Sequence, residues 1–231
     1  MARKKPGFDE SVEMYLKTIA ELSATSDPVP VTLVASRLGI STVSASEMVH
    51  RLEEQGLLEH TPYKGVRMTR AGLLRANAVI RRHQLWEVFL YEKLGMSWAD
   101  THDLACVLEH VSAPQLSDAL FTFLGQPERC PHGNRIPAVG DTHVPMVGRP
   151  LNCIEPGRKV IIESIPLEEK QLLDQMEQEG IVPGEVVEIL ACNEAADRLD
   201  ILCGDRSVQL TFDAAKSVFA VDAEEQELQL E

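Results

Sequence analysis

Residues whose side chains bind metal ions are concentrated in one short part of the sequence. Six of them lie in the segments RRHQLWE and HDLACVLEH: His83, Glu87, His102, Cys106, Glu109 and His110. Imidazole, thiolate and carboxylate groups are ligands for divalent transition metals, so their clustering predicts a metal site. Any one of them alone has a simpler explanation, because a single histidine on an apolar helix face is usually buried and hydrogen-bonded.

Helical geometry divides these six residues into two groups. His102 and His110 are separated by roughly 12 Å along a helix axis at ~1.5 Å per residue, which is too far for one ion. Cys106, Glu109 and His110 lie about one turn apart and can share an ion. His102 is left to join the upstream pair in RRHQLWE, whose i,i+4 spacing places both side chains on one helix face. The sequence therefore predicts two neighbouring sites.

Two helices are expected to carry these ligands. The stretch from Ala71 to about Leu94 contains no glycine or proline after Gly72 and predicts one long helix. A second helix is expected from near Ser97, which can cap it, to about Ser112. Several apolar residues of the helical region are expected to form either a dimer surface or an intrachain core: Trp86, Phe89, Leu116 and Leu120.

The N-terminal third has the pattern of a winged helix-turn-helix domain. Helices are predicted over residues 8–23, from about Thr32 to a stop at Gly39, and over STVSASEMVHRLEEQG, where Ser41 can act as the N-cap. Four apolar residues of the third helix are expected to face a core: Val43, Met48, Val49 and Leu52. Two short strands around PYKG follow. Two helices around a tight glycine turn, followed by a hairpin, are typical of this DNA-binding domain.

The third helix and the hairpin are the predicted DNA-contacting surface. Small polar residues in the first turns let a helix enter the major groove and offer hydroxyl groups to bases or phosphates. The predicted DNA-binding residues are Arg37, Ser41, Thr42, Ser44, Ala45, Ser46, Arg51, Tyr63 and Lys64. The alternative is a three-helix domain whose hairpin binds protein.

The distribution of charge permits DNA binding although the net charge is −14. Residues 1–75 hold 10 Lys+Arg and 9 Asp+Glu, whereas residues 76–231 hold 12 and 27. The acidic excess is thus confined to the later part of the chain, and the N-terminal third can approach phosphates if its cations share one face.

The C-terminal third is predicted to be rich in β-structure. The stretch AVGDTHVPMVGRPLN has the composition of a linker, and four apolar or alternating segments after it predict a small β-barrel: KVIIESI, GEVVEILAC, RLDILCG and SVQLTF. We therefore predict a mainly α fold with a β C-terminal part, in four sections: a DNA-binding domain over 1–75, a helical metal-binding and dimerisation domain over 76–140, a linker over 141–152 and a β domain over 153–231.

Over essentially its full length, the chain resembles the diphtheria toxin repressor family of iron- and manganese-dependent regulators. The most specific segments are EMYLKTIAEL, RRHQLWE, HDLACVLEH and CPHGNRIP. The resemblance implies a homodimeric transcriptional repressor of metal-homeostasis genes that metal binding activates for a palindromic operator in double-stranded DNA. It also implies that the last domain is SH3-like (FeoA-like), since GIVPGEVVEI is similar to that domain.

The resemblance also assigns ligands. The implied activating site consists of Met14, Cys106, Glu109 and His110, and the implied ancillary site consists of His83, Glu87 and His102. In some members a glutamate and a glutamine of the last domain complete the ancillary site, which here would be Glu168 and Gln171. In others the CPHG turn takes part, here through Cys130 and His132, although a rigid structural turn is the alternative interpretation of that motif.

The ligand types favour Fe²⁺ over Mn²⁺. Manganese-selective members tend to place carboxylates where this chain has Met14 and Cys106, and thioether and thiolate are softer ligands. Mn²⁺ is the alternative, because Glu13 beside Met14 can rotate in as a carboxylate. Co²⁺, Ni²⁺ or Zn²⁺ can substitute, since the Irving–Williams order gives Zn²⁺ high affinity for such sites.

Other classes of protein fit the sequence less well. No stretch has the apolar length of a membrane span and MARKKPGFDES lacks the apolar core of a signal peptide, so we expect a cytoplasmic protein without a membrane partner. Five cysteines are then expected to be thiols or ligands. A metal-dependent hydrolase is the alternative of another class, but no HExxH or GxSxG motif occurs, and we expect neither enzyme activity nor a small-molecule substrate. A metal-binding adaptor that contacts only protein is a third possibility.

Overall fold

The computed structural model describes residues 8–23, 26–110, 113–144, 146–166 and 170–223. They fall into two compact units, each assembled from separate stretches of the chain. The first unit comprises Met1–His83, Leu108–Ala113 and Pro137–Val144, and the second comprises Gln84–Val107, Pro114–Ile136 and Pro145–Glu231. The helices α4 (Arg70–Val88) and α5 (Trp98–Leu108) contribute residues to both units.

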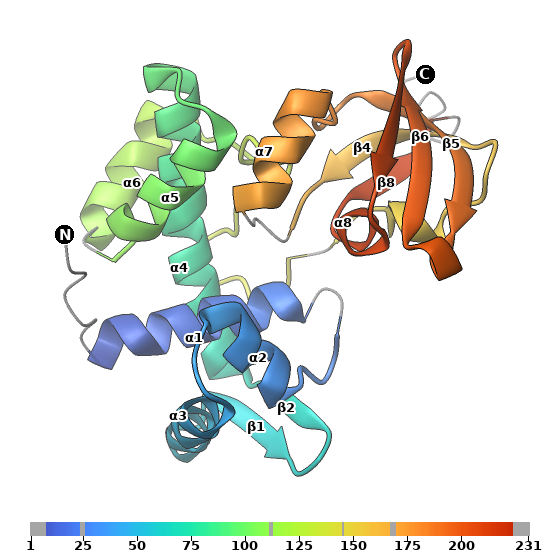
Figure 1. Ribbon diagram of the computed structural model, residues 1–231. Coiled ribbons are helices and arrows are strands. Elements are labelled where there is room, and N and C mark those ends of the chain that lie inside the picture. The colour runs from blue at the N-terminus through green and yellow to red at the C-terminus, as the bar shows by residue number, and fades with distance from the viewer. Residues whose placement is uncertain (1–7, 24–25, 111–112, 145, 167–169, 224–231) are drawn as a thin grey trace. The chain divides into compact units, whose positions relative to one another are not determined.

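The first unit contains a three-helix head with a two-stranded wing (Figure 1). Its elements are α1 (Phe8–Leu22), α2 (Val31–Leu38), α3 (Thr42–Glu54), β1 (Leu58–Thr61) and β2 (Gly65–Met68). The two strands pair in antiparallel register. The helices and hairpin predicted for the N-terminal third are therefore confirmed.

The turn between α2 and α3 follows from its sequence. Gly39 ends α2 in the left-handed conformation, with φ of 64°, which glycine adopts without a steric penalty. Ser41 then caps α3, because its hydroxyl accepts a hydrogen bond from the Ser44 backbone N–H at 3.1 Å. This short connection fixes the direction in which α3 leaves the turn.

The wing is held against the segment that joins α1 to α2. Val29 forms an isolated antiparallel bridge with Val66. Glycine is required at position 65, since a Cβ atom there would lie 2.3 Å from the Val29 carbonyl oxygen. The hairpin is thereby fixed to the head and does not hang from β1 alone.

Apolar residues at helical spacing form the core of the head. The buried side chains include Val12, Tyr15, Leu16, Ile19, Val34, Ala35, Ala45, Val49, Leu52, Leu58 and Val66. Burying each large aliphatic side chain contributes about 1.5–3 kcal/mol. One expectation was wrong: Val43 is 70% exposed, because it lies in the first turn of α3 beyond the core.

The helical part of the second unit departs in one respect from the predicted single helix ending near Leu94. The α-helical geometry of α4 ends at Val88, and the π-helical segment η1 (Phe89–Lys93) follows it. After α5 the chain forms α6 (Pro114–Phe123). Of the four residues expected at a dimer surface or in the core, Leu120 is buried, Leu116 is 46% exposed, and the half-buried Trp86 and Phe89 form a T-shaped pair at 5.8 Å.

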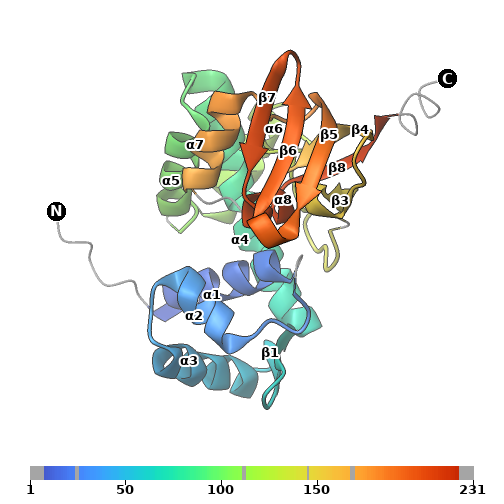
Figure 2. The ribbon, with the colours of Figure 1, turned by 45° about the vertical axis from the view of Figure 1, so that its right-hand side comes forward.

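The rest of the second unit contains a six-stranded antiparallel sheet in the order β3-β8-β4-β5-β6-β7 (Figure 2). The strands are β3 (Arg149–Pro150), β4 (Lys159–Ser164), β5 (Val186–Asn193), β6 (Arg198–Cys203), β7 (Arg206–Leu210) and β8 (Phe219–Asp222). Helical segments connect them: η2 (Leu151–Cys153), α7 (Lys170–Glu179), η3 (Glu194–Ala196) and α8 (Phe212–Lys216). The four predicted strand segments are confirmed, whereas β3, β8 and the helices α7 and α8 were not predicted.

Alternating burial along β4 and β6 places one face of the sheet in a core. Residues of α7 and of the start of α5 join that core, among them Leu173, Met176 and Trp98. The expected fold class is therefore confirmed. None of the five cysteines, all of which are described, forms a disulfide. Among the described residues, no helix combines the length and the apolar character needed to cross a membrane.

Candidate metal centre

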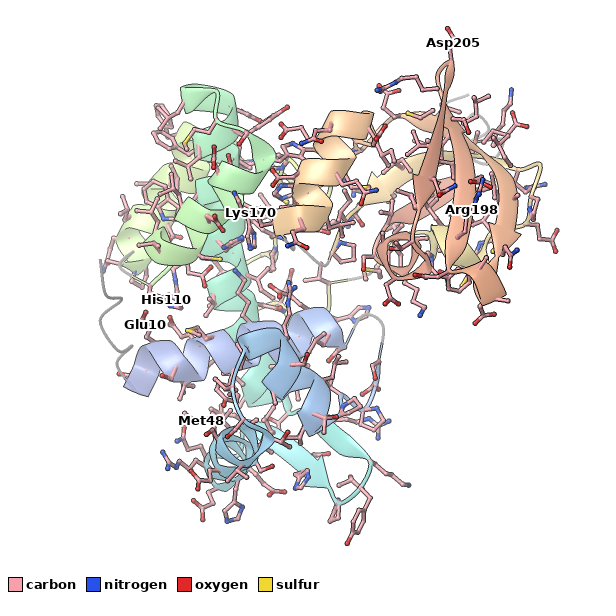
Figure 3. All side chains as sticks on the ribbon, in the orientation of Figure 1. Glu10, Met48, His110, Lys170, Arg198 and Asp205 are labelled. Atoms are coloured by element: carbon pink, nitrogen blue, oxygen red, sulfur yellow. The ribbon has the colours of Figure 1, made fainter. Side chains whose placement is uncertain are left out.

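His110 lies between two carboxylates in the first unit. Its Nδ1 is 2.9 Å from Glu13 Oε2, and its Nε2 is 3.3 Å from Glu109 Oε1. Glu13 belongs to α1, and the other two residues follow the end of α5 directly. Figure 3 shows His110 beside the first turns of α1, near Glu10. The first helix of the head thus contacts the predicted ligand segment directly.

The cations Lys17 and Arg82 complete this group, together with the imidazole of His83. Lys17 Nζ donates a hydrogen bond to Glu109 Oε2 at 2.8 Å, and His83 Nδ1 lies 2.6 Å from the same oxygen. Arg82 donates to Glu13 Oε1 at 2.7 Å and to the Glu109 backbone carbonyl at 2.7 Å. We call these residues the first group: Glu13, Lys17, Arg82, His83, Glu109 and His110.

The contacts of the first group shift the pKa values of its members. Burial alone would raise the pKa of Glu109, but the Lys17 charge and the His83 hydrogen bond lower it to about 2. Burial also opposes ionisation of Glu13, yet the His110 hydrogen bond and the Arg82 charge hold its pKa below the usual value. The hydrogen bond to Glu13 raises the pKa of His110, as do the nearby carboxylates, against the effect of burial. Both carboxylates are therefore kept ionised, as metal ligands must be.

The other two predicted activating ligands, Met14 and Cys106, make other contacts. Met14 lines a cavity of about 260 Å³ in the head, together with Leu38, Ile40 and Met48. Cys106 belongs to the second unit, where its Sγ is 3.6 Å from His102 Nε2. The side chain that α1 presents to His110 is therefore that of Glu13, the residue expected only as an alternative to Met14.

A second set of ligand-type residues meets in the second unit. The ligand atoms of Glu87, Cys130 and His132 all lie within 4.8 Å of one another. All three are buried, with exposed fractions of 0%, 5% and 0%. Glu87 Oε1 is 3.3 Å from His132 Nδ1 and 3.5 Å from His102 Nδ1. We call Glu87, His102, Cys130 and His132 the second group.

The CPHG turn is held by the strand β4 and the residue after it. The Ile165 backbone N–H donates to the His132 carbonyl at 2.9 Å, and the Asn134 amide donates to the Ile165 carbonyl at 2.9 Å. Gly133 has φ of 81°, and a Cβ atom there would lie 2.1 Å from the Glu163 carbonyl oxygen. The turn is therefore rigid, in agreement with the alternative prediction that CPHG is a structural turn. It also places two ligand-type side chains, those of Cys130 and His132, close to Glu87.

Trp98, the first residue of α5, connects the second group to α7. Its ring packs edge-on against the His132 ring, with centroids 4.9 Å apart. Its backbone N–H donates to the Glu177 carboxylate of α7 at 3.3 Å. Lys170, labelled in Figure 3, forms ion pairs with Asp100 and Asp103 of α5. These contacts attach α7 to the N-terminal end of α5.

The predicted ancillary residues have several ligand-type neighbours. Glu87 and His102 lie in the second unit, where Glu87 also contacts His132, and His83 contacts Glu109 in the first unit. Gln171 is exposed on α7, and Glu168 lies outside the described residues. Helical rise alone did not predict the contact of His83 with Glu109, because the rotation of each helix about its own axis decides which neighbour a side chain meets.

Comparisons with known proteins match the whole architecture. Three family descriptions match successive parts of the chain: the iron dependent repressor N-terminal DNA binding domain over 8–66, its metal binding and dimerisation domain over 69–138, and the FeoA domain over 149–221. The chain is 31% identical over 219 residues to the diphtheria toxin repressor of Corynebacterium glutamicum, covering 90% of this chain and 95% of that protein. The chain belongs to the diphtheria toxin repressor family.

Other members of the diphtheria toxin repressor family are similar over nearly their full length. The iron-dependent repressor IdeR of Mycobacterium leprae is 28% identical over 221 residues, covering 90% of this chain and 96% of that protein. A solved structure described as a manganese-dependent transcriptional repressor complex with manganese is 32% identical, with a TM-score of 0.82, over 91% of this chain and 99% of that one. Family members thus include proteins named for iron and for manganese.

Both groups offer donors that fit the divalent metals of this repressor family. The first group offers carboxylate oxygens and imidazole nitrogens, and the second adds a thiol sulfur. Ligand bonds to Zn²⁺ of about 2.0–2.3 Å require donor atoms within about 4 Å of one another, close to the spacing of the second group. A buried carboxylate such as that of Glu87 is costly unless a cation or donors balance it, which also suits a metal site.

Sequence reasoning missed three residues that shape these sites. Lys17 and Arg82 neutralise the first group, and Trp98 packs on the second. A signal for Lys17 was present, because it stands four residues after Glu13 and so shares its face of α1. Arg82 and Trp98 act through tertiary contacts that spacing does not show.

The predicted DNA-binding residues of this repressor family member lie mostly on the surface. Ser41, Thr42, Ser44, Ser46, Arg51, Tyr63 and Lys64 are exposed, and Arg37 is half-buried. Ala45 is a correction: it is fully buried in the core of the head, since it lies on the inner face of α3, and cannot contact a base. Tyr63 protrudes at the tip of the wing with φ of 64°.

Proposed function

We propose that this chain is a metal-activated transcriptional repressor that binds a palindromic operator in double-stranded DNA as a homodimer and controls metal-homeostasis genes. One observation carries the proposal: Glu13, on the first helix of the winged head, contacts His110 of the ligand segment. When bound there, a divalent ion supplies positive charge that these acidic and imidazole side chains can share. By sharing the ion, Glu13 and His110 then hold α1 against the residues that follow α5. This contact stabilises the head in the conformation that binds DNA. The role is regulatory and not catalytic.

For the activating site we propose Cys106, Glu109 and His110, with Glu13 or Met14 as the ligand from α1. The spacing of about one helical turn supports the first three. The softness of the Cys106 thiolate supports Fe²⁺. The contact of the Glu13 carboxylate with His110 supports Mn²⁺ as the second candidate, since oxygen ligands suit that ion. The 32% identical structure described with manganese also supports it.

For the ancillary site we propose Glu87, Cys130 and His132, with His102 beside them. Their mutual spacing and burial support this set over one completed by Gln171, which is exposed. His83 belongs to the first group by its contact with Glu109.

For DNA contact we propose the exposed first turns of α3 and the tip of the wing. Thr42 and Ser46 offer hydroxyl groups, and the exposed Val43 offers an apolar side chain of the kind that contacts thymine methyl groups. Arg51 and Lys64 offer charges for phosphates.

For dimerisation we propose the helical part of the second unit. It exposes six large apolar side chains: Tyr91, Leu94, Leu104, Val107, Leu116 and Phe123. Leu104 and Val107 share a face of α5, and Leu116 and Phe123 share a face of α6. The match of residues 69–138 to a metal binding and dimerisation domain also supports a homodimer.

The test is a DNA mobility-shift assay on operator-containing genomic fragments with Fe²⁺ under anaerobic conditions, with Mn²⁺, and with chelator. We expect tight binding only with metal, and Cys106→Glu should shift the preference toward Mn²⁺ because it replaces a soft ligand with a hard one. Equal affinity in chelator would contradict metal activation. No binding under any condition would favour a protein-binding adaptor.

A further inference from the structure

We propose that Lys17 is a built-in competitor for the metal ion: its ammonium group occupies Glu109 in the metal-free protein and sets the metal concentration at which the site fills. This inference rests on the proposed function, because it concerns the activating site. Its evidence is independent, however, since it comes from contacts of Lys17 that the metal-ligand spacing does not involve.

The first observation is that one oxygen of Glu109 is already saturated. Glu109 Oε2 accepts a hydrogen bond from Lys17 at 2.8 Å and contacts His83 Nδ1 at 2.6 Å. A carboxylate oxygen has two lone-pair directions, and these two partners use both. A metal ion can therefore use this oxygen only if Lys17 or His83 withdraws from it.

The second observation concerns charge. The four charged side chains of the first group cancel formally, since two carboxylates face two cations: Glu13, Glu109, Lys17 and Arg82. A divalent cation would add two positive charges to this neutral set. The Lys17 and Glu109 side chains are only 9% and 2% exposed, so water screens that repulsion poorly. Of the two partners on the saturated oxygen, Lys17 binds as an ammonium cation, whereas a neutral imidazole such as that of His83 can donate the same hydrogen bond. Lys17 is therefore the one to leave.

The third observation is an alternative partner for Lys17. Glu21 stands four residues later on α1, and its Oε1 is 4.0 Å from Lys17 Nζ. The Glu21 side chain is 20% exposed, so it lies closer to water than Glu109. A small rotation of the lysine side chain exchanges one carboxylate for the other, and the ammonium group never has to enter an apolar region. Lys17 and Glu21 both belong to α1, so a change of partner at Glu109 also changes an ion pair within α1.

A purely structural lysine and a competing lysine predict opposite results. If Lys17 only supports the fold, its removal weakens both the metal-free protein and the metal site. If Lys17 competes, its removal weakens the metal-free protein and strengthens metal binding. The direction of the change in metal affinity therefore decides between them.

The experiment is calorimetric titration of the full-length protein with Mn²⁺ and with Co²⁺, combined with thermal unfolding in chelator. Lys17→Met removes the charge and keeps the apolar stem, and it should raise metal affinity at least about tenfold while lowering the melting temperature in chelator. Lys17→Arg keeps the charge and should stay within about threefold of wild type. Glu21→Gln removes the alternative partner and should lower metal affinity by about two- to threefold.

Controls separate this inference from the proposed function. Lys93→Met removes an exposed lysine and should leave metal affinity unchanged, which excludes an effect of net charge. If Lys17→Met fails to fold, Lys17→Gln is tested in its place. Unchanged or weaker metal binding in these Lys17 variants would overturn the competition. Should Glu109→Gln and His110→Ala leave metal binding unchanged, the activating site itself would be refuted.

Discussion

The two groups of metal-ligand residues differ in how their carboxylates are balanced. In the first group, Glu13 and Glu109 face the cations of Lys17 and Arg82. In the second, the carboxylate of Glu87 meets the imidazoles of His102 and His132. The first group is also more open, because the Glu13 side chain is 25% exposed while Glu87 is fully buried.

This difference suits different tasks. The cations of the first group balance its carboxylates without a metal ion, as a site that reports metal concentration requires. The second group takes two of its four residues, Cys130 and His132, from a buried, rigid turn, so less ordering is needed for an ion to bind there. We therefore expect the second group to retain its metal at concentrations where the first is empty.

The largest effect that would test this contrast is on stability without metal. Glu109→Ala should lower the free energy of unfolding in chelator by about 1–3 kcal/mol, because it removes the closest carboxylate of the buried Lys17 and leaves only Glu21, at 4.0 Å, to balance the charge. Glu87→Ala should cost less, since its imidazole neighbours can remain neutral. Urea unfolding in chelator measures both. Asp213→Ala, at a side chain that is 91% exposed, is the control and should change stability by less than about 0.5 kcal/mol. Equal losses for the two buried glutamates would remove the contrast.

The next effect concerns metal stoichiometry. Cys130→Ser should weaken the second group at least about tenfold, because a hydroxyl is a poorer ligand than a thiolate, and should leave the first group filled. Equilibrium dialysis with Co²⁺ should then show one bound ion per chain where wild type shows two. Cys192→Ser alters an exposed cysteine and should retain both ions. Two ions in Cys130→Ser would place the second site elsewhere.

The smallest effect separates the two candidates on α1. Glu13→Gln should lower Mn²⁺ affinity of the first group by about tenfold, whereas Met14→Leu, a volume-conserving change, should alter it by less than about threefold. Calorimetric titration measures both variants against wild type. The reverse order would show that Met14 turns out of its cavity to bind the ion, and that the carboxylate at position 13 serves mainly to hold Arg82.

Much of the fold was predictable because local patterns decide it. Apolar periodicity placed the helices of the head, and turn residues placed β1, β2 and the four longer strands of the sheet. The short strands β3 and β8 escaped prediction because pairing within the sheet, and not their own sequence, defines them. Val43 was predicted in the core and Ala45 on the DNA-contacting surface, and both predictions were wrong. A helical pattern alone does not fix which side of α3 meets the core.

The candidate site was predictable in its residue types but not in its partnerships. Every ligand-type residue of the two groups except Glu13 was assigned to a metal site from spacing or from the family resemblance, and Glu13 was named as an alternative. Which residue meets which depends on helix rotation and tertiary packing, and so the contact of His83 with Glu109 did not follow from sequence. Lys17 was not predicted because an ammonium group is not a metal ligand, and its contact with Glu109 depends on tertiary packing.

The attachment of the CPHG turn to β4 has a consequence for how the protein can be divided. Cys130 and His132 precede the β domain in the chain, yet the backbone of their turn is hydrogen-bonded to Ile165. The same turn packs so closely on Glu163 that no side chain fits at position 133. A chain cut before Arg149 would still encode both donors but would lose the scaffold that aims them at Glu87. Removing the FeoA domain would thus also disturb the proposed second metal site, although the residues of that site lie outside the domain. We therefore expect such a truncation to lower the metal content of the repressor as well as its size.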